Sequence, residues 1–142
     1  MTGPRRSWLF VPGADAAAHV AASRSGADVL IHELEDFTPP GLRPKARSMA
    51  VALYELWRRS GATVAVRINP FATDGRADLS AVMAGAPQIV LMSKVDSPQQ
   101  VKALADAVGK LERKHGIPAG STELVPNIET AAGLVRTLDI AR

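Results

Sequence analysis

Short apolar runs alternate with longer alanine-rich stretches along the whole chain. The apolar runs predict buried β-strands over residues 8–11, 29–31, 64–68, 89–92 and 123–125. The stretches between them predict helices over about residues 15–24, 44–59, 77–84 and 98–114, and a last helix that follows Glu129 and reaches the end of the sequence. No linker or low-complexity segment interrupts the pattern, so residues 1–142 are expected to form one domain.

Strands that alternate with helices are typical of an α/β fold built from right-handed parallel units. Two arrangements fit this order, a doubly wound open sheet and a (β/α)₈ barrel. The open sheet is expected to carry a glycine-rich phosphate loop after its first strand, and residues 11–15 do not have the GxGxxG pattern. The barrel is therefore the preferred prediction.

The length of the chain limits how much of a barrel it can form. Five strand–helix units are predicted in 142 residues, whereas a complete barrel takes about 250 residues. We therefore expect residues 1–142 to be an incomplete TIM-barrel catalytic domain, with the remaining units outside the given sequence.

Composition excludes several other classes of protein. Apolar residues make up 46% of the chain and charged residues 22%, which is typical of a globular protein. The absence of cysteine excludes disulfide scaffolds, cysteine nucleophiles and zinc fingers, and the three histidines are too dispersed for a metal cage. No apolar run is long enough for a membrane helix, and no signal-peptide pattern follows Arg5 and Arg6, so a cytoplasmic protein without a membrane partner is expected.

The net charge of +3 changes this picture little. Basic residues are scattered along the chain and aromatic residues amount to only 4%, so nucleic acid is not an expected partner. A small anionic substrate remains compatible with the charge.

Polar side chains gather where the predicted strands end. They are Glu33, Glu35, Asp36, Arg67, Asn69, Lys94, Asn127 and Glu129. In a barrel the carboxyl ends of the strands meet on one face, which is where the active site lies. This convergence predicts an enzyme, with Arg67, Asn69, Lys94 and Glu129 as candidate substrate-binding residues.

Most of these residues also have a structural interpretation. Arg67 follows buried strand positions, so it either pairs with Glu35 or Asp36, or uses its planar fork to hold a substrate carboxylate or enolate oxygen. Glu129 is either a carboxylate favoured by a helix N-terminus or an oxygen ligand for Mg²⁺. The acidic cluster at Glu33, Glu35 and Asp36 fits a solvated turn as well as a site, and Lys94 fits a structural role or a phosphate contact.

Other polar residues receive structural predictions only. His32 is expected to pack inside the sheet, while His19 and His115 are expected on helix surfaces. The residues Asp74, Arg76 and Asp78 are expected in an ordinary charged loop.

Five short segments resemble, in the correct order, those of the HpcH/HpaI aldolase and citrate lyase family, in particular its citrate lyase beta subunit-like members. Residues 6–13 (RSWLFVPG) are similar to the family's opening, and residues 26–28 with 33–36 resemble its "GAD…DLEDAV" segment. Residues 66–70 match "VRINP", residues 93–96 are similar to "PKVES", and residues 128–133 match "IETAAG". Two departures lie together: Glu33 replaces an aspartate, and Phe37 replaces a small residue. The loop over residues 39–44 also differs from the common form.

The resemblance implies a Mg²⁺-dependent carbon–carbon lyase on a TIM barrel of the phosphoenolpyruvate/pyruvate-binding type. Its substrates would be citryl- or malyl-type hydroxy acids or their CoA thioesters, cleaved or formed through an enolate, and the enzyme would be a homo-oligomer. By the same resemblance, Arg67 binds a substrate oxygen and Glu129 ligates Mg²⁺, while Glu35 and Asp36 hold the metal's water shell or orient Arg67. A second metal-binding aspartate would lie beyond Arg142.

Two other functions remain open at this point. One is a class II pyruvate aldolase that acts on free 2-oxo acids without a thioester. The other is a non-catalytic binding or assembly module, because five units leave exposed strand edges that pair readily with another chain.

Overall fold

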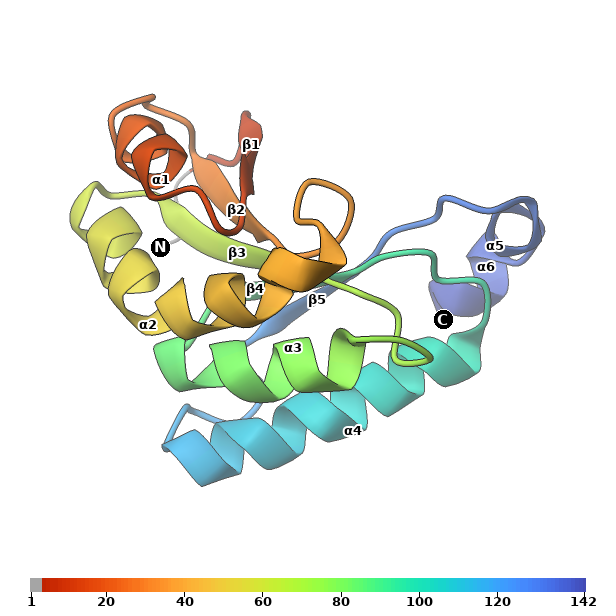
Figure 1. Cartoon of the computed structure of the whole chain (residues 1–142). Helices are drawn as coiled ribbons and strands as arrows, with labels where there is room; N and C mark the ends of the chain where they lie inside the picture. Colours follow the sequence, from red (N-terminus) through yellow and green to blue (C-terminus); the bar gives the residue numbers. More distant parts are fainter. Residues whose placement is uncertain (1–3) are drawn as a thin grey trace.

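A computed structural model of the protein describes residues 4–142 and contains one parallel sheet with its strands in the order β1-β2-β3-β4-β5 (Figure 1). The strands are β1 (Trp8–Pro12), β2 (Val29–Glu33), β3 (Thr63–Ile68), β4 (Ile89–Met92) and β5 (Glu123–Pro126). The α-helices are α1 (Ala16–Ser23), α2 (Arg43–Arg59), α3 (Gly75–Val82), α4 (Pro98–His115), α5 (Ala131–Val135) and α6 (Thr137–Ile140), and two short 3₁₀ helices are η1 (Pro40–Leu42) and η2 (Met83–Gly85). This order confirms the predicted alternation of strands and helices.

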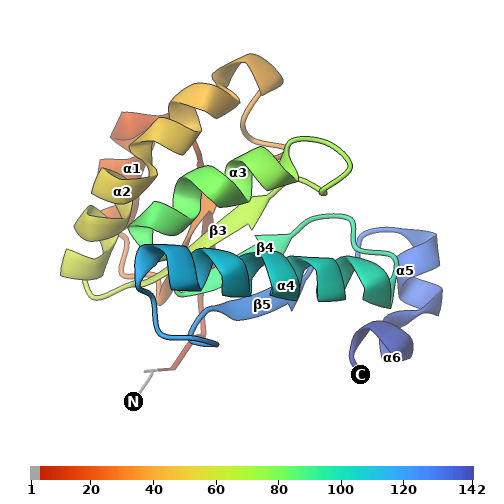
Figure 2. The same ribbon diagram turned by 90° about the horizontal axis from the view of Figure 1, so that it is seen from below.

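The helices cover one face of the sheet. Figure 2 shows α2, α3 and α4 lying over the strands on the same side. Alternate strand residues such as Leu30, Val66 and Val90 join the helices in the main apolar core. The other face carries a smaller cluster made of strand residues, among them Ile31 and Leu91. A doubly wound sheet would have helices on both faces, so the arrangement is that of a barrel wall.

The sheet is also strongly curled. Arg5, just before β1, donates two hydrogen bonds of 2.6 Å to the carboxylate of Glu123, the first residue of β5. Since β1 and β5 are the two outermost strands of the described sheet, this pair joins its opposite edges at their amino ends. The strands do not close into a complete barrel within residues 4–142, and the fold is a partial TIM-barrel-like one.

Two predicted helix ends agree with the structure, and the last predicted helix differs from it. Ser97 forms a capping box with Gln100 at the start of α4, and Gly61 has a positive φ just after α2. The chain after Glu129 forms two short helices in place of one long one. The hydroxyl of Thr137 donates to the carbonyls of Gly133 and Leu134, which offers this backbone a local alternative to a continuous helix.

Two predictions about charged and histidine side chains are wrong. His19 is buried on the inner side of α1, where its Nε2 lies 2.9 Å from the Pro12 carbonyl oxygen, because α1 packs directly on α2. Asp78 is fully buried in α3 and bonds to the backbone and side-chain amides of Asn69 and to Arg47. His32 is packed inside, as predicted.

His32 lies at the centre of a buried polar cluster under α2. Its ring nitrogens lie 3.0 Å from the Tyr54 hydroxyl and 3.0 Å from the Gly13 carbonyl oxygen. Its ring meets the rings of His19 and Tyr54 edge to face, and Trp57 donates to the His19 carbonyl. The cluster ties α2 to the loop between β1 and α1.

Acid is expected to destabilise the fold through His32. Burial lowers the pKa of His32 from 6.5 to about 4, and burial lowers the pKa of His19 as well. Between pH 6.5 and about 4 the unfolded chain therefore binds a proton that the folded chain does not, so the free energy of unfolding falls as the pH falls, by up to about 3 kcal/mol. Urea unfolding across this range should show a shallower pH dependence for His32→Gln than for wild type, and equal slopes would contradict the prediction.

Gly13 lets the loop after β1 approach β2 closely. A Cβ atom on Gly13 would collide with the Glu33 carbonyl oxygen and lie 2.9 Å from Thr38 Oγ1. Gly13→Ala is therefore expected to reduce the free energy of unfolding by about 1–3 kcal/mol, measured by denaturant unfolding. Gly41→Ala is the matched control, because a Cβ there meets no atom within 4 Å, and an equal loss in both variants would contradict the prediction.

None of the helices described in residues 4–142 combines the length and the apolar character needed to cross a membrane.

Candidate active site

Arg67 is the central cation at the carboxyl ends of the strands. It lies near the end of β3, is 7% exposed, and is in register with Glu33 on β2. Its Nε donates a 2.8 Å hydrogen bond to Glu33 Oε1. Its Nη atoms lie 3.4 Å from Glu35, 3.8 Å from Asp36 and 3.5 Å from Glu129. The strands thus bring Arg67 together with carboxylates from two separate segments, residues 33–36 and the loop after β5.

Two aromatic rings flank the guanidinium group of Arg67. Its Cζ lies 4.8 Å from the centre of the Phe10 ring and 5.9 Å from that of Phe37, and the two rings meet edge to face. Such rings attract a cation and keep water from part of its surface. Phe37, one of the departures from the family pattern, is therefore a wall of the site.

The loop after β2 carries Glu35 and Asp36. Glu35 is 3% exposed, whereas the side chain of Asp36 is largely exposed. Glu35 Oε1 contacts the ammonium of Lys94, while its Oε2 is buried without a hydrogen bond, although Arg67 lies 3.4 Å from it. A buried carboxylate oxygen with a free acceptor position is suited to a donor or a cation that enters the site.

Lys94 connects β4 to the loop after β5. Its backbone is in the left-handed region with φ of 53°, and its amide donates a 2.9 Å hydrogen bond to Glu129 Oε2. The hydrogen bond to Glu35 raises the pKa of Lys94, and the charges of Glu35, Asp36 and Glu129 act in the same direction. Lys94 is therefore a second fixed cation of the site.

Asn69 lies beneath the site and supports it. Its side-chain amide donates to the Leu34 carbonyl at 2.9 Å and to Asp78 at 2.7 Å, and it is 3% exposed. Asn127 is half-buried after β5, and its Oδ1 is buried without a hydrogen bond partner. In this arrangement the Asn69 amide holds the backbone after β2.

Glu33 has no role that the sequence predicts beyond its membership of the acidic cluster. It is fully buried at the end of β2, and its carboxylate accepts hydrogen bonds from Arg67 and from the backbone amides of Glu35 and Phe37. The signal for this role is its position, because Glu33 is the last residue of β2 whereas Glu35 and Asp36 lie in the turn that follows.

The charges around Arg67 suit a divalent cation. Four carboxylates, those of Glu33, Glu35, Asp36 and Glu129, surround two cations, so the group carries a surplus of two negative charges. No three Asp, Glu or His side chains in the described part of the chain form a complete metal cage. Mg²⁺ usually takes one or two protein carboxylates and keeps several waters, so the donor set of Glu129 and Glu35 fits this ion.

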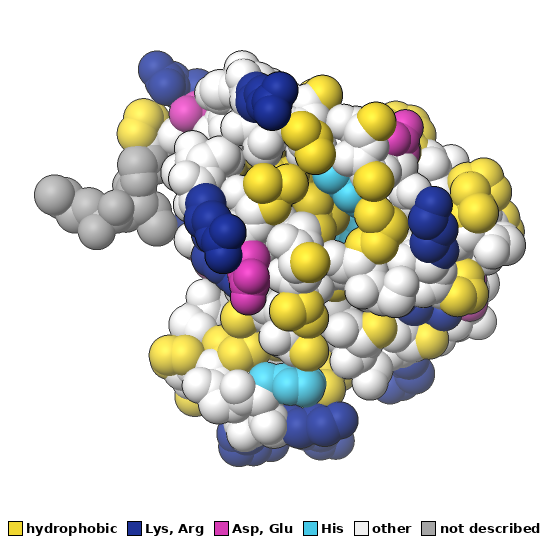
Figure 3. Space-filling view, turned by 60° about the vertical axis from the view of Figure 1, so that its left-hand side comes forward, with side chains coloured by type: hydrophobic (Ala, Val, Ile, Leu, Met, Phe, Trp, Pro, Cys, Tyr) yellow, Lys and Arg dark blue, Asp and Glu magenta, His cyan; other side chains and the backbone are white. Residues whose placement is uncertain are grey.

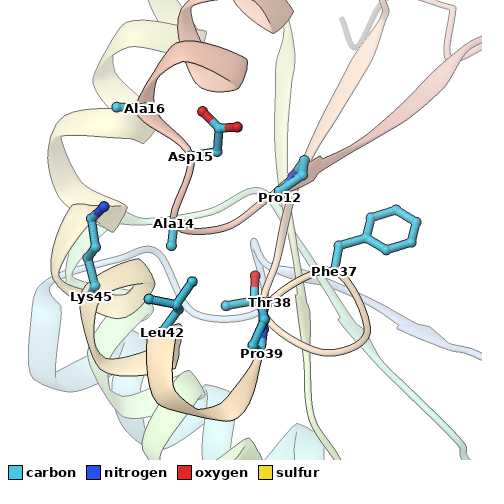
Figure 4. A pocket seen from close by; sticks show the side chains of 9 residues that line it. All are labelled: Pro12, Ala14, Asp15, Ala16, Phe37, Thr38, Pro39, Leu42 and Lys45. Carbon is cyan, nitrogen blue, oxygen red and sulfur yellow. The ribbon is translucent and has the colours of Figure 1, made fainter.

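A hollow lies beside the site, between the loops that follow β1 and β2 (Figure 4). Its volume is about 300 Å³, and it is lined by Pro12, Ala14, Asp15, Ala16, Phe37, Thr38, Pro39, Leu42 and Lys45. Figure 4 shows that it is bordered by an aspartate, a lysine and apolar side chains. Because Phe37 borders both this hollow and Arg67, the two spaces are adjacent.

A second hollow of about 240 Å³ lies between α1 and α2, on the outer side of the wall. Its lining is Ala16, His19, Val20, Met49, Ala52, Leu53 and Leu56. Figure 3 shows apolar side chains around a histidine on the face that carries these helices. None of the candidate site residues lines this hollow, so it is separate from the arginine–carboxylate site.

The fold and the site together define a partial α/β-barrel domain with an arginine–carboxylate site at the carboxyl ends of its strands. Residues 6–142 match the family model of the HpcH/HpaI aldolase/citrate lyase domain. The chain belongs to this family, which confirms the resemblance found in the sequence.

Relatives in the family include enzymes with two different names. The chain is 36% identical over 142 residues to citrate lyase subunit beta of Escherichia coli (strain K12), covering 99% of this chain and 47% of that protein. It is 34% identical to citrate lyase subunit beta of Haemophilus influenzae, covering 96% and 47%. It is 29% identical to a (3S)-malyl-CoA thioesterase of Cereibacter sphaeroides, covering 97% and 45%. The chain thus spans about half the length of the curated relatives it matches.

Proposed function

We propose that the protein cleaves or forms a carbon–carbon bond next to a carboxylate or thioester carbonyl, with Mg²⁺, on citryl- or malyl-type hydroxy acids or their CoA thioesters. The observation that carries the proposal is the buried Arg67 among four carboxylates at the carboxyl ends of the strands. Membership of a lyase and aldolase family supports the reaction class.

The reaction needs a positive group where negative charge develops. When the bond breaks, the hydroxyl loses its proton to a base and its carbon becomes a carbonyl, while the electron pair of the broken bond forms the enolate of the carboxylate or thioester group. The enolate is then protonated to give the shorter acid or thioester. Arg67 offers its Nη donors to the developing oxyanion, and the surrounding rings of Phe10 and Phe37 exclude water and so strengthen that interaction.

Glu129 and Glu35 are the residues that would hold Mg²⁺. The ion, when bound, supplies Lewis-acid stabilisation of the oxygen that becomes negative. Lys94 fixes Glu129 through its backbone amide, and Asp36 lies at the open side of the same group, where it can hold water molecules of the ion's shell.

A relative named (3S)-malyl-CoA thioesterase favours a second candidate, the hydrolysis of a thioester by the same site. In that reaction water attacks the thioester carbonyl, the carbon–sulfur bond breaks, and a free acid and CoA thiol are released. The same oxyanion-stabilising arginine would serve both reactions.

The products distinguish these functions. The complete natural polypeptide should be incubated with malyl-CoA or citryl-CoA in the presence of Mg²⁺ or excess EDTA. Acetyl-CoA that forms only with Mg²⁺ supports the lyase, free thiol without acetyl-CoA supports the hydrolase, and condensation of pyruvate with an aldehyde supports the class II aldolase. The lyase proposal is wrong if none of the thioesters gives acetyl-CoA and the free hydroxy acids are not cleaved either.

A further inference from the structure

We infer that Glu33 is a positioning residue which fixes, from one buried carboxylate, both the guanidinium of Arg67 and the loop that carries Glu35 and Asp36. This inference rests on the proposed function, because it assigns a role in that same site. It concerns a side chain that does not face substrate and that precedes the two acids expected to act there.

The first step is the hold on Arg67. Glu33 is the carboxylate within hydrogen-bond distance of the guanidinium, at 2.8 Å from Nε, whereas Glu35, Asp36 and Glu129 lie 3.4–3.8 Å from the Nη atoms. Both partners are buried, with side-chain exposures of 8% for Arg67 and 0% for Glu33. A charge-assisted bond at Nε fixes the plane of the guanidinium and leaves its outer Nη donors for the site.

The second step is the hold on the loop. The same oxygen that bonds Arg67, Glu33 Oε1, accepts the amide of Glu35 at 2.7 Å, and Oε2 accepts the amide of Phe37 at 2.6 Å. The Glu33 carbonyl also accepts the Thr38 hydroxyl, which in turn accepts the Gly13 amide. The turn that presents Glu35 and Asp36 is therefore bonded to Glu33 at both of its ends.

The third step is that only a carboxylate can serve in this position. Both oxygens of Glu33 face N–H donors, and these are the guanidinium and two backbone amides. In Glu33→Gln the new amide group would point a donor at one of these donors, and the negative charge that balances Arg67 would be lost. Glu33→Asp keeps two acceptor oxygens and the charge.

The test combines a signal from Arg67 itself with kinetics, in the complete natural polypeptide. The Arg67 Nε–H group is observed in nitrogen-15 NMR spectra and assigned by its loss in Arg67→Lys. A protected, hydrogen-bonded signal is expected in wild type and in Glu33→Asp, and its loss is expected in Glu33→Gln. With malyl-CoA and Mg²⁺, Glu33→Gln should lower kcat by about 100-fold with a much smaller change in KM, and Glu33→Asp should recover most of the loss.

Glu112→Gln is the matched control for a purely structural effect. Glu112 is another buried glutamate that accepts two backbone amides, those of Gly120 and Thr122, far along the fold from Arg67. Glu112→Gln should lower the unfolding temperature to a similar extent as Glu33→Gln, while the kcat of Glu112→Gln should equal that of wild type.

The two readouts separate this inference from the proposed function. An Arg67 Nε–H signal that is unchanged in Glu33→Gln overturns the inference, whatever the reaction proves to be. A lost signal with unchanged kcat also overturns it. If the complete polypeptide cleaves none of the thioesters or free hydroxy acids, the lyase proposal fails, and the NMR result still decides whether Glu33 holds Arg67.

Discussion

Replacement of Arg67 by lysine is expected to lower kcat by about 100- to 1000-fold, the usual cost of removing one preorganised donor to a developing oxyanion. Lysine keeps the positive charge, but it lacks the planar fork that bonds Glu33 through Nε and directs the Nη atoms toward the site. The loss should therefore fall on turnover, with a smaller effect on the affinity for substrate.

Lysine is chosen as the replacement because it separates an effect on turnover from an effect on the stability of the fold. Arg67→Ala would leave Glu33 buried without its cation, and breaking a buried ion pair in this way costs about 3–5 kcal/mol. Loss of activity in the alanine variant would then be explained by unfolding alone. Circular dichroism and the unfolding temperature should show that Arg67→Lys is folded.

Arg58→Lys is the control for the general effect of an arginine-to-lysine change. Arg58 lies on α2 and donates to the carbonyls of Gly85 and Ala86, away from the carboxyl ends of the strands. The kcat of the Arg58→Lys variant should match that of wild type. Arg67→Lys with wild-type kcat for the thioester substrate would show that the guanidinium does not stabilise the transition state.

The sequence predicts the fold well because each strand is a compact apolar run, and the three central strands β2, β3 and β4 are buried on both faces. Residues 29–33 and 89–92 are buried throughout, so neither strand shows the alternation that a half-exposed strand would have. The loss of the last helix was not predictable in this way. Arg136, with φ of −101° and ψ of 12°, separates α5 from α6, and hydrophobic periodicity does not reveal such a break.

The sequence predicts which residues gather at the candidate site, but it does not predict how deeply each of them is buried. Strand-end positions brought Arg67, Lys94 and Glu129 into one list, because parallel strands end at a common edge. Burial then separates residues that looked equivalent in the sequence: Glu33 and Asp78 are fully buried, while Asp36 is exposed. The sequence does not distinguish a charged residue in an exposed turn from one in a buried pair. Glu33 is buried because it pairs with Arg67 on the face of the sheet opposite the helices, and Asp78 is buried where it bonds to Asn69 and Arg47.

The departures from the family pattern acquire a physical meaning in the structure. Phe37 borders both Arg67 and the adjacent hollow. Glu33 reaches both Arg67 and the Phe37 amide from the same buried position. The two changes therefore touch each other and act on the same wall of the site.

Glu129→Gln is expected to weaken Mg²⁺ binding by at least about 10- to 100-fold, since even residues that only support a metal ligand have effects of this size. The side-chain oxygen of glutamine still accepts the Lys94 amide, so the loop after β5 should keep its conformation. What the variant removes is one negative charge from the group around Arg67, and with it a hard anionic oxygen of the kind that Mg²⁺ prefers.

The measurement is calorimetric titration of Mg²⁺ into the complete natural polypeptide, followed by the Mg²⁺ dependence of turnover. Activity of Glu129→Gln should be partly recovered at high Mg²⁺ concentration, because the remaining carboxylates still attract the ion. Glu123→Gln is the matched control. Glu123 begins β5, the strand that precedes Glu129, and pairs with Arg5 at the opposite end of that strand, so its replacement should leave the Mg²⁺ affinity unchanged. Equal Mg²⁺ affinities for Glu129→Gln and wild type would remove Glu129 from the proposed metal site.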